Sequence, residues 1–99
     1  MRAVAEYLDR HYAVSITTQT LSSTFGYVPS YLSLLFRREY GCSPADYLQN
    51  IRIERAKDIL KHEKGVFVKE VAFRVGFKNQ FHFSKTFKTI VGVQPSEYR

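Results

Sequence analysis

The chain has 99 residues, of which 44% are hydrophobic and 15% aromatic, enough for one small domain or two very small ones without disulfides or a structural metal. Its only cysteine, Cys42, cannot form an intramolecular disulfide, which favours a cytoplasmic, reducing setting. No apolar run approaches the roughly 20 residues of a membrane span and no signal-peptide pattern appears, so we expect a soluble protein with no membrane partner.

The net charge of +6 is distributed unevenly. Residues 1–50 hold four basic and four acidic side chains, whereas the whole chain holds 15 and nine. Residues 51–99 therefore hold the other 11 basic and five acidic side chains and account for the whole +6. A basic half indicates a polyanionic partner such as nucleic acid. A surface charged only for solubility is the alternative that charge leaves open.

Helical signals follow one another from the start of the chain. Apolar residues in the segment 2–12 fall on one side of a helix. Thr17 is a plausible N-cap for a short helix that runs to about Phe25. Pro29 fits the first turn of a third helix, which we expect to reach about Tyr40. Both of the last two helices are followed directly by glycine, a common stop.

The longest helix is expected over residues 44–62. It opens with a cap, a proline and an acidic first turn in Ser43-Pro44-Ala45-Asp46. Its apolar residues recur at helical spacing, and those expected to face inward are Leu48, Ile51, Ala56, Ile59 and Leu60. Further helices are expected at Val68–Val75, at about Asn79–Val91 and from Gln94-Pro95 onward. No strand alternation appears, so the predicted fold class is all-α with about seven helices.

The chain also repeats itself. Landmarks of the first copy, Leu21, Gly26, Phe36, Gly41, Pro44 and Tyr47, return as Val71, Gly76, Phe87, Gly92, Pro95 and Tyr98. The offset is 50 residues as far as the first glycine and 51 beyond it, so the extra residue falls in a turn. Each copy predicts the helix-turn-helix pattern, whose second helix can lie in the major groove of DNA. We expect one such subdomain at 1–43, a linker helix at 44–62 and a second subdomain at 63–99.

Helical periodicity separates an inner and an outer face on the longer helix of each copy. The expected buried stripes are Leu32, Leu35, Phe36 and Tyr40 in the first, and Phe83, Thr86, Phe87 and Ile90 in the second. The outer faces and the second helix start supply the candidate DNA-binding residues, which are Ser30, Ser33, Leu34, Arg37, Lys78, Asn79, Gln80, Phe81, Ser84, Lys85 and Lys88.

These residue types suit double-stranded DNA. Gln80 can pair with a base edge, Lys85 can reach guanine acceptors or a phosphate, and the serines can bond to either. Leu34 and Phe81 are apolar on a face that should be wet, and contact with a thymine methyl would account for them. Packing against a neighbouring helix or another domain is the alternative. Arg37 and Lys88 each follow the core phenylalanine of their copy and could hold phosphates or be plain surface charges.

The expected linker helix has a useful length. About 19 residues of helix span roughly 28 Å, close to the separation of about 34 Å between successive major grooves on one face of DNA. One chain could thus do what a dimer of helix-turn-helix proteins does.

No catalytic, metal or cofactor site is expected. The three histidines lie far apart without metal-ligand spacing, and no nucleotide-binding or nucleophile motif occurs. We therefore expect that the chain is not an enzyme.

The chain resembles the DNA-binding domain of AraC/XylS-type transcription regulators from about Tyr7 onward. The segments that carry the resemblance are Gly41–Leu48, Arg52–Leu60, Glu70–Phe77, Phe83–Lys88 and Gly92–Arg99. The resemblance implies two helix-turn-helix units on a long helix that read adjacent major-groove segments near a promoter. It also implies a larger parent protein with an effector-binding, dimerising or receiver domain. Because Met1 opens directly onto the first expected helix, we expect an excised domain; a small stand-alone family member is the alternative.

Three positions depart from the family pattern. Ser22 stands where the family usually has alanine, and Val28 and Phe67 stand where it often has a Ser or Thr cap. We expect weaker helix starts at the latter two, by roughly 1 kcal/mol each.

A second hypothesis for the function makes the chain a protein-interaction module. It would dock RNA polymerase or an effector domain through exposed Tyr31, Leu34 and Phe81.

Overall fold

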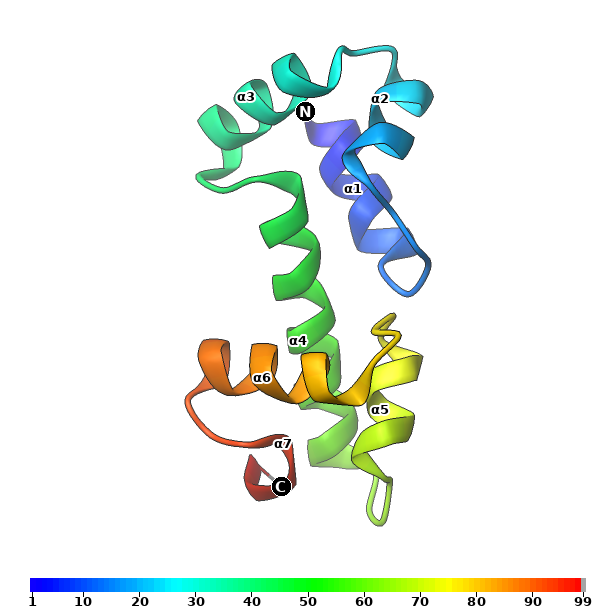
Figure 1. The fold of residues 1–99 in the computed structure, drawn as a ribbon, viewed down its shortest axis with the longest axis vertical. Coiled ribbons are helices and arrows are strands. Elements are labelled where there is room, and N and C mark those ends of the chain that lie inside the picture. Colours follow the sequence, from blue (N-terminus) through cyan, green and yellow to red (C-terminus); the bar gives the residue numbers. More distant parts are fainter. Residues whose placement is uncertain (99) are drawn as a thin grey trace. The chain divides into compact units, whose positions relative to one another are not determined.

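In the computed structural model, which describes residues 1–98, the chain is all-α (Figure 1). Its helices are α1 (Arg2–His11), α2 (Thr18–Phe25), α3 (Pro29–Tyr40), α4 (Pro44–His62), α5 (Val68–Arg74), α6 (Gln80–Val91) and α7 (Pro95–Tyr98). The predicted fold class is confirmed, and α3 and α4 begin and end at the predicted residues. No helix over residues 1–98 combines the length and the apolar character that crossing a bilayer requires.

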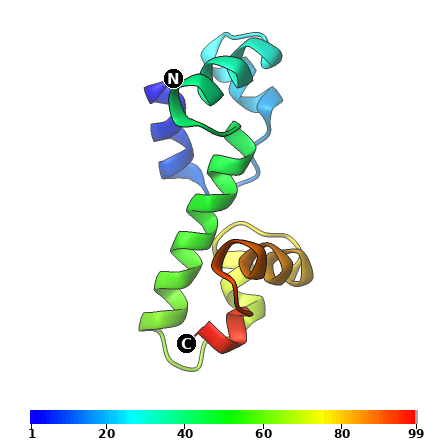
Figure 2. The same ribbon diagram turned by 90° about the vertical axis from the view of Figure 1, so that its left-hand side faces the viewer.

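The chain folds as two compact units, residues 1–49 and the residues from Asn50 onward. The first unit holds α1, α2, α3 and the start of α4, and the second holds the rest of α4 with α5, α6 and α7 (Figure 2). In the first unit α2 packs on α3, and in the second α5 packs on α6. Each unit therefore contains one helix pair of the kind that the repeat predicts.

The repeat extends to atomic geometry. The rings of Phe36 and Tyr47 meet edge to face with centroids 5.3 Å apart and planes at 83°. Their counterparts Phe87 and Tyr98 meet at 5.5 Å and 78°. Such edge-to-face pairs are a preferred packing of aromatic rings. In both copies this contact attaches the helix that begins with the repeated proline to the middle of the preceding longer helix.

Glycine ends both of these longer helices. Gly41 and Gly92 have φ angles of 78° and 101°, values that side chains with a Cβ rarely adopt. The N–H group of each glycine donates to a helix carbonyl at 2.8 Å, that of Arg37 in one copy and Lys88 in the other. The left-handed turn is therefore part of how each copy closes its helix.

The starts of the helices differ more than their ends. The Thr17 hydroxyl accepts from the Thr20 N–H at 3.1 Å, which confirms the predicted cap of α2. Ser43 accepts from the Asp46 N–H at 3.2 Å at the start of α4. Val28 and Phe67 provide no side-chain cap for α3 and α5, as their residue types predict.

One prediction about the core was wrong, and one core residue was missed. Ile90 was expected in the buried stripe of α6, but its side chain is 43% exposed. It lies in the last turn, one residue before α6 ends at Val91, so the stripe lacks a following turn to complete it. In α4, Ile53 was omitted from the inward positions although it is fully buried; it shares one helical stripe with Ala56 and Leu60.

Two helices begin or end one residue away from their predicted bounds. Helix α5 ends at Arg74 rather than Val75, because Val75 has left helical geometry (φ −95°, ψ 2°) and is buried in the core instead. Helix α6 begins at Gln80 because Asn79 is its N-cap.

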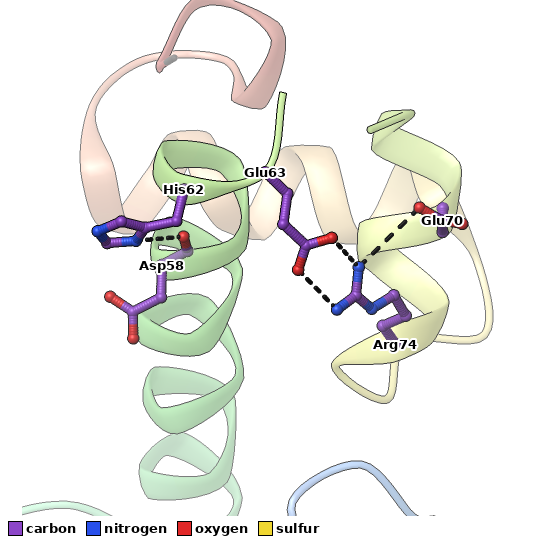
Figure 3. A network of polar contacts seen from close by, with 5 residues as sticks. All are labelled: Asp58, His62, Glu63, Glu70 and Arg74. Carbon is purple, nitrogen blue, oxygen red and sulfur yellow. Dashed lines mark hydrogen bonds and ion pairs between the residues drawn. The ribbon is translucent and has the colours of Figure 1, made fainter. Parts of the chain in front are cut away.

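An ion-pair cluster links the end of α4 to α5 (Figure 3). Arg74 donates from both terminal nitrogens to the two carboxylate oxygens of Glu63, each at 2.8 Å, and a Glu70 oxygen lies 4.0 Å away. These bonds from Arg74 lower the pKa of the Glu63 carboxyl below its usual value. A ring nitrogen of His62 bonds to the Asp58 carbonyl at 2.9 Å and closes the last turn of α4.

Candidate nucleic-acid interface

In the first unit, the predicted residues of α3 lie on its outer face. Ser30, Leu34 and Arg37 are exposed and Ser33 is half-buried, while Leu34 keeps 48% of its surface exposed. Leu32 and Phe36 lie fully buried on the opposite face. The separation of faces by helical periodicity is therefore confirmed for α3.

The turn before α3 has an unexpected support. The Ser22 hydroxyl donates to the carbonyl of Tyr27, which links α2 to the residue just before the uncapped start of α3. Alanine, the usual family residue at this position, could not make this bond. The departure at Ser22 therefore ties down the turn through which α3 is presented.

In the second unit, the outer face of α6 is both basic and apolar. Phe81 is 79% exposed, and Lys85 and Lys88 are exposed beside it. These three side chains line one open hollow together with Ser84, Thr89 and Gln94. The structure therefore brings four of the predicted residues together and adds two polar groups that the prediction missed.

The sequence carried a signal for only one of the two missed residues. Thr89 lies four positions after Lys85 and so shares its face of α6, and its hydroxyl donates to the Lys85 carbonyl at 2.9 Å. Gln94 lies in the turn before α7, and helical spacing could not assign it to this hollow.

Asn79, one of the predicted DNA-binding residues, is the N-cap of α6. Its side-chain oxygen accepts from the N–H groups of Phe81 at 2.7 Å and His82 at 3.0 Å. The oxygen is thus used to cap α6, and only the amide nitrogen is left to donate to a phosphate. Lys78, one residue earlier, is exposed.

Gln80 is separated from the other α6 candidates. It lines a second hollow with Val68, Lys69, Glu70 and two exposed phenylalanines, Phe67 and Phe73. The first turn of α6 therefore has two distinct surroundings, a basic hollow around Phe81 and a largely apolar one around Gln80.

An aromatic cluster supports the start of α6 from inside. The buried ring of Phe77 lies 5.3 Å from that of Phe83 and 5.4 Å from the His82 ring. The guanidinium carbon of Arg52, from α4, lies 5.8 Å from the centre of the Phe77 ring. Burial lowers the pKa of Arg52, although it stays cationic at any physiological pH. These contacts hold the turn between α5 and α6 and thereby orient the basic hollow.

Comparison with known proteins identifies the two-copy architecture. A sequence model described as a helix-turn-helix domain matches residues 21–99, most of the chain. The chain belongs to the AraC/XylS family of transcription regulators. It is similar to the C-terminal domain of AraT, a response regulator from Geobacillus stearothermophilus, with a TM-score of 0.93, 32% identity and coverage of 99% of this chain and 81% of that one.

Two further comparisons agree. The uncharacterised transcriptional regulator YijO of Escherichia coli K12 is 36% identical over 97 residues, which are 98% of this chain and 34% of YijO. The DNA-binding domain of AdpA, solved in complex with a target DNA, has a TM-score of 0.91 at 24% identity, over 98% of this chain and 86% of that one, and so shows the same fold. The chain spans about a third of the length of the curated relatives it matches.

Proposed function

We propose that this chain is a sequence-specific double-stranded DNA-binding domain of a transcription regulator. The observation that carries the proposal is the outer face of α6, where Lys85 and Lys88 flank exposed polar and apolar groups on the second helix of a helix-turn-helix unit. Cations on such a helix neutralise phosphates, while uncharged side chains beside them reach base edges. Membership of a family of transcription regulators supports the same function.

In this proposal the two recognition helices, α3 and α6, read adjacent major-groove segments. The subdomain of residues 1–43 presents α3, residues 63–99 present α6, and α4 joins them. Lys85 and Gln80 contact bases, Lys88, Arg37 and Lys78 contact phosphates, and the serines contact either. The second copy supplies more of the affinity because it carries the net positive charge.

Salt dependence tests the proposal directly. Each phosphate neutralised contributes about 0.9 to the slope of log affinity against log salt concentration. Selection from a random duplex pool first supplies a specific site, and fluorescence anisotropy then measures affinity for it between low and moderate salt. A slope of several units supports the proposal, and a slope near zero contradicts it.

A second candidate function rests on exposed apolar residues. Large apolar side chains are open to solvent on α3 (Tyr31 and Leu34) and, separately, at the start of α5 and within it (Phe67 and Phe73). They suit docking of RNA polymerase or of an effector or receiver domain in a longer parent protein. This function predicts association that changes little with salt and leaves no footprint on DNA, so the same titrations separate it from the first.

A further inference from the structure

We propose that Phe81 recognises the C5-methyl group of one thymine in the DNA segment read by α6. The inference deepens the proposed function by naming what this side chain selects. It rests on how the second unit exposes Phe81, on the charges that surround this residue, and on which atoms of a base edge a phenyl ring can contact favourably.

Phe81 is held outward by the start of its helix. It is the second residue of α6, and its N–H group donates to the Asn79 side chain at 2.7 Å. Its ring is 79% exposed, while Phe83, two residues later, is fully buried. The first turn of α6 therefore presents an apolar ring at the end of the helix that approaches base edges in helix-turn-helix proteins.

The charges around Phe81 favour DNA over an apolar protein partner. The ring shares its hollow with Lys85 and Lys88 and with no acidic residue. An apolar partner seated there would remove water from two lysines without giving them counter-charges, which is costly. Duplex DNA brings phosphates for the lysines at the same time as it brings base edges to the ring.

Base chemistry then narrows the contact. A phenyl ring offers no hydrogen bond, so it would leave the polar atoms of a guanine, adenine or cytosine edge without a partner. The C5-methyl group of thymine is the apolar group that the base pairs present in the major groove. A thymine methyl against Phe81 buries apolar surface on both sides, and a contact to the methyl group does not require the ring to cover the neighbouring O4 acceptor.

Phe67 supplies a matched control. Its exposure, 78%, nearly equals that of Phe81, and it belongs to the same unit. It lines the other hollow, where Lys69 is accompanied by Glu70. Replacing either phenylalanine with alanine removes the same exposed ring, but only Phe81 lies in the basic hollow.

The experiment replaces each thymine of the selected site, one at a time, with deoxyuridine, which lacks only the methyl group. The unmodified 99-residue chain is expected to lose about fourfold in affinity at one thymine, the value for one methyl group leaving an apolar contact. Phe81→Ala should bind the thymine and deoxyuridine duplexes equally at that position. Phe67→Ala should keep the full difference, and Phe81→Leu, which restores an apolar side chain, should keep part of it.

Several outcomes overturn the inference. These are a selected site with no methyl-sensitive thymine, a methyl effect that persists in Phe81→Ala, and a methyl effect that Phe67→Ala alone abolishes. In each case salt-dependent binding to the selected site would still support DNA binding as such. Failure to select any duplex would instead contradict the proposed function itself.

Discussion

Helices α3 and α6 have the same length, 12 residues, and the same C-terminal glycine, yet they differ in how they begin and in what they expose. Asn79 caps α6 with two hydrogen bonds, whereas Val28 caps α3 with none. The outer face of α6 carries a phenylalanine, a serine and two lysines where that of α3 carries two serines, a leucine and one arginine. The comparison teaches that the repeated skeleton is what each fold unit needs, while the exposed positions are free to serve different contacts.

The largest effect is expected where the two copies are most alike. Phe36 and Phe87 are fully buried and each packs on the tyrosine of its own copy. Replacing either with alanine should lower the free energy of unfolding by about 3–5 kcal/mol, because a large cavity replaces the ring. Urea unfolding of the two variants measures this. A small loss for one and a large loss for the other would show that the copies are not equivalent inside.

The next largest effect, on DNA binding, should distinguish the outer face of α6 from that of α3. Lys85→Ala is expected to relax preference for one base by about 1–3 kcal/mol, while Lys88→Ala should weaken all duplexes alike and reduce the salt slope by about 0.9. Ser33→Ala on the outer face of α3 serves as the comparison and should change discrimination less, because a serine has shorter reach than a lysine. Competition binding with single-base variants of the selected site tests this ranking. Greater loss of discrimination from Ser33→Ala would reverse the roles of the two copies.

The N-caps of α6 and α3 allow two substitutions that should change the stability of the chain in opposite directions. Asn79→Ala should lower the stability of the chain by about 1 kcal/mol, because two N–H groups of α6 lose their acceptor. Val28→Asn should raise it by up to about 1 kcal/mol, since φ −64° and ψ 137° at this position already suit a capping residue. Thermal unfolding of both variants measures the pair. A gain from Asn79→Ala, or a clear loss from Val28→Asn, would show that the cap difference does not govern the two helix starts.

The smallest effect concerns the exposed ion pair between Glu63 and Arg74 in the second unit. The pKa of Glu63 is lowered by Arg74, so the pair contributes stability above the unfolded-state pKa, about 4.3 for glutamate, and loses it as pH falls through the lower folded-state value. Glu63→Gln should therefore lower the unfolding temperature slightly at pH 7, and this difference should shrink as the pH falls through the folded-state pKa of Glu63. A difference that grew on acidification would contradict this sign.

Much of the fold followed from local signals in the sequence. The proline starts at Pro29 and Pro44, the Thr17 cap and the glycine stops each act within a few residues, so sequence alone placed α2, α3 and α4 closely. Ile53 and Ile90 were misplaced because burial depends on which other helix covers a side chain. Arg52 and Gln94 escaped notice for the same reason, since each reaches its neighbours through tertiary contacts.

For the candidate interface, too, local features could be predicted from the sequence and tertiary ones could not. Periodicity separated the outer from the inner faces of α3 and most of α6, because it depends only on the helical repeat. It could not reveal that the Asn79 oxygen is used by two backbone N–H groups or that Gln80 and Lys85 line different hollows. Those facts require the path of the chain between α5 and α6. Which candidate residues contact DNA remains a prediction.

The missing cap at Val28 has a consequence for the entropy of recognition. A helix start without a side-chain acceptor opens more often, so amide hydrogens in the first turn of α3 should exchange with solvent faster than those of α6. Ordering that turn on a ligand then carries a conformational cost that the pre-ordered α6 avoids. The second copy would thus present an ordered helix start and the first copy an adaptable one. An adaptable start of α3 would widen the range of DNA sequences that the first copy can accept.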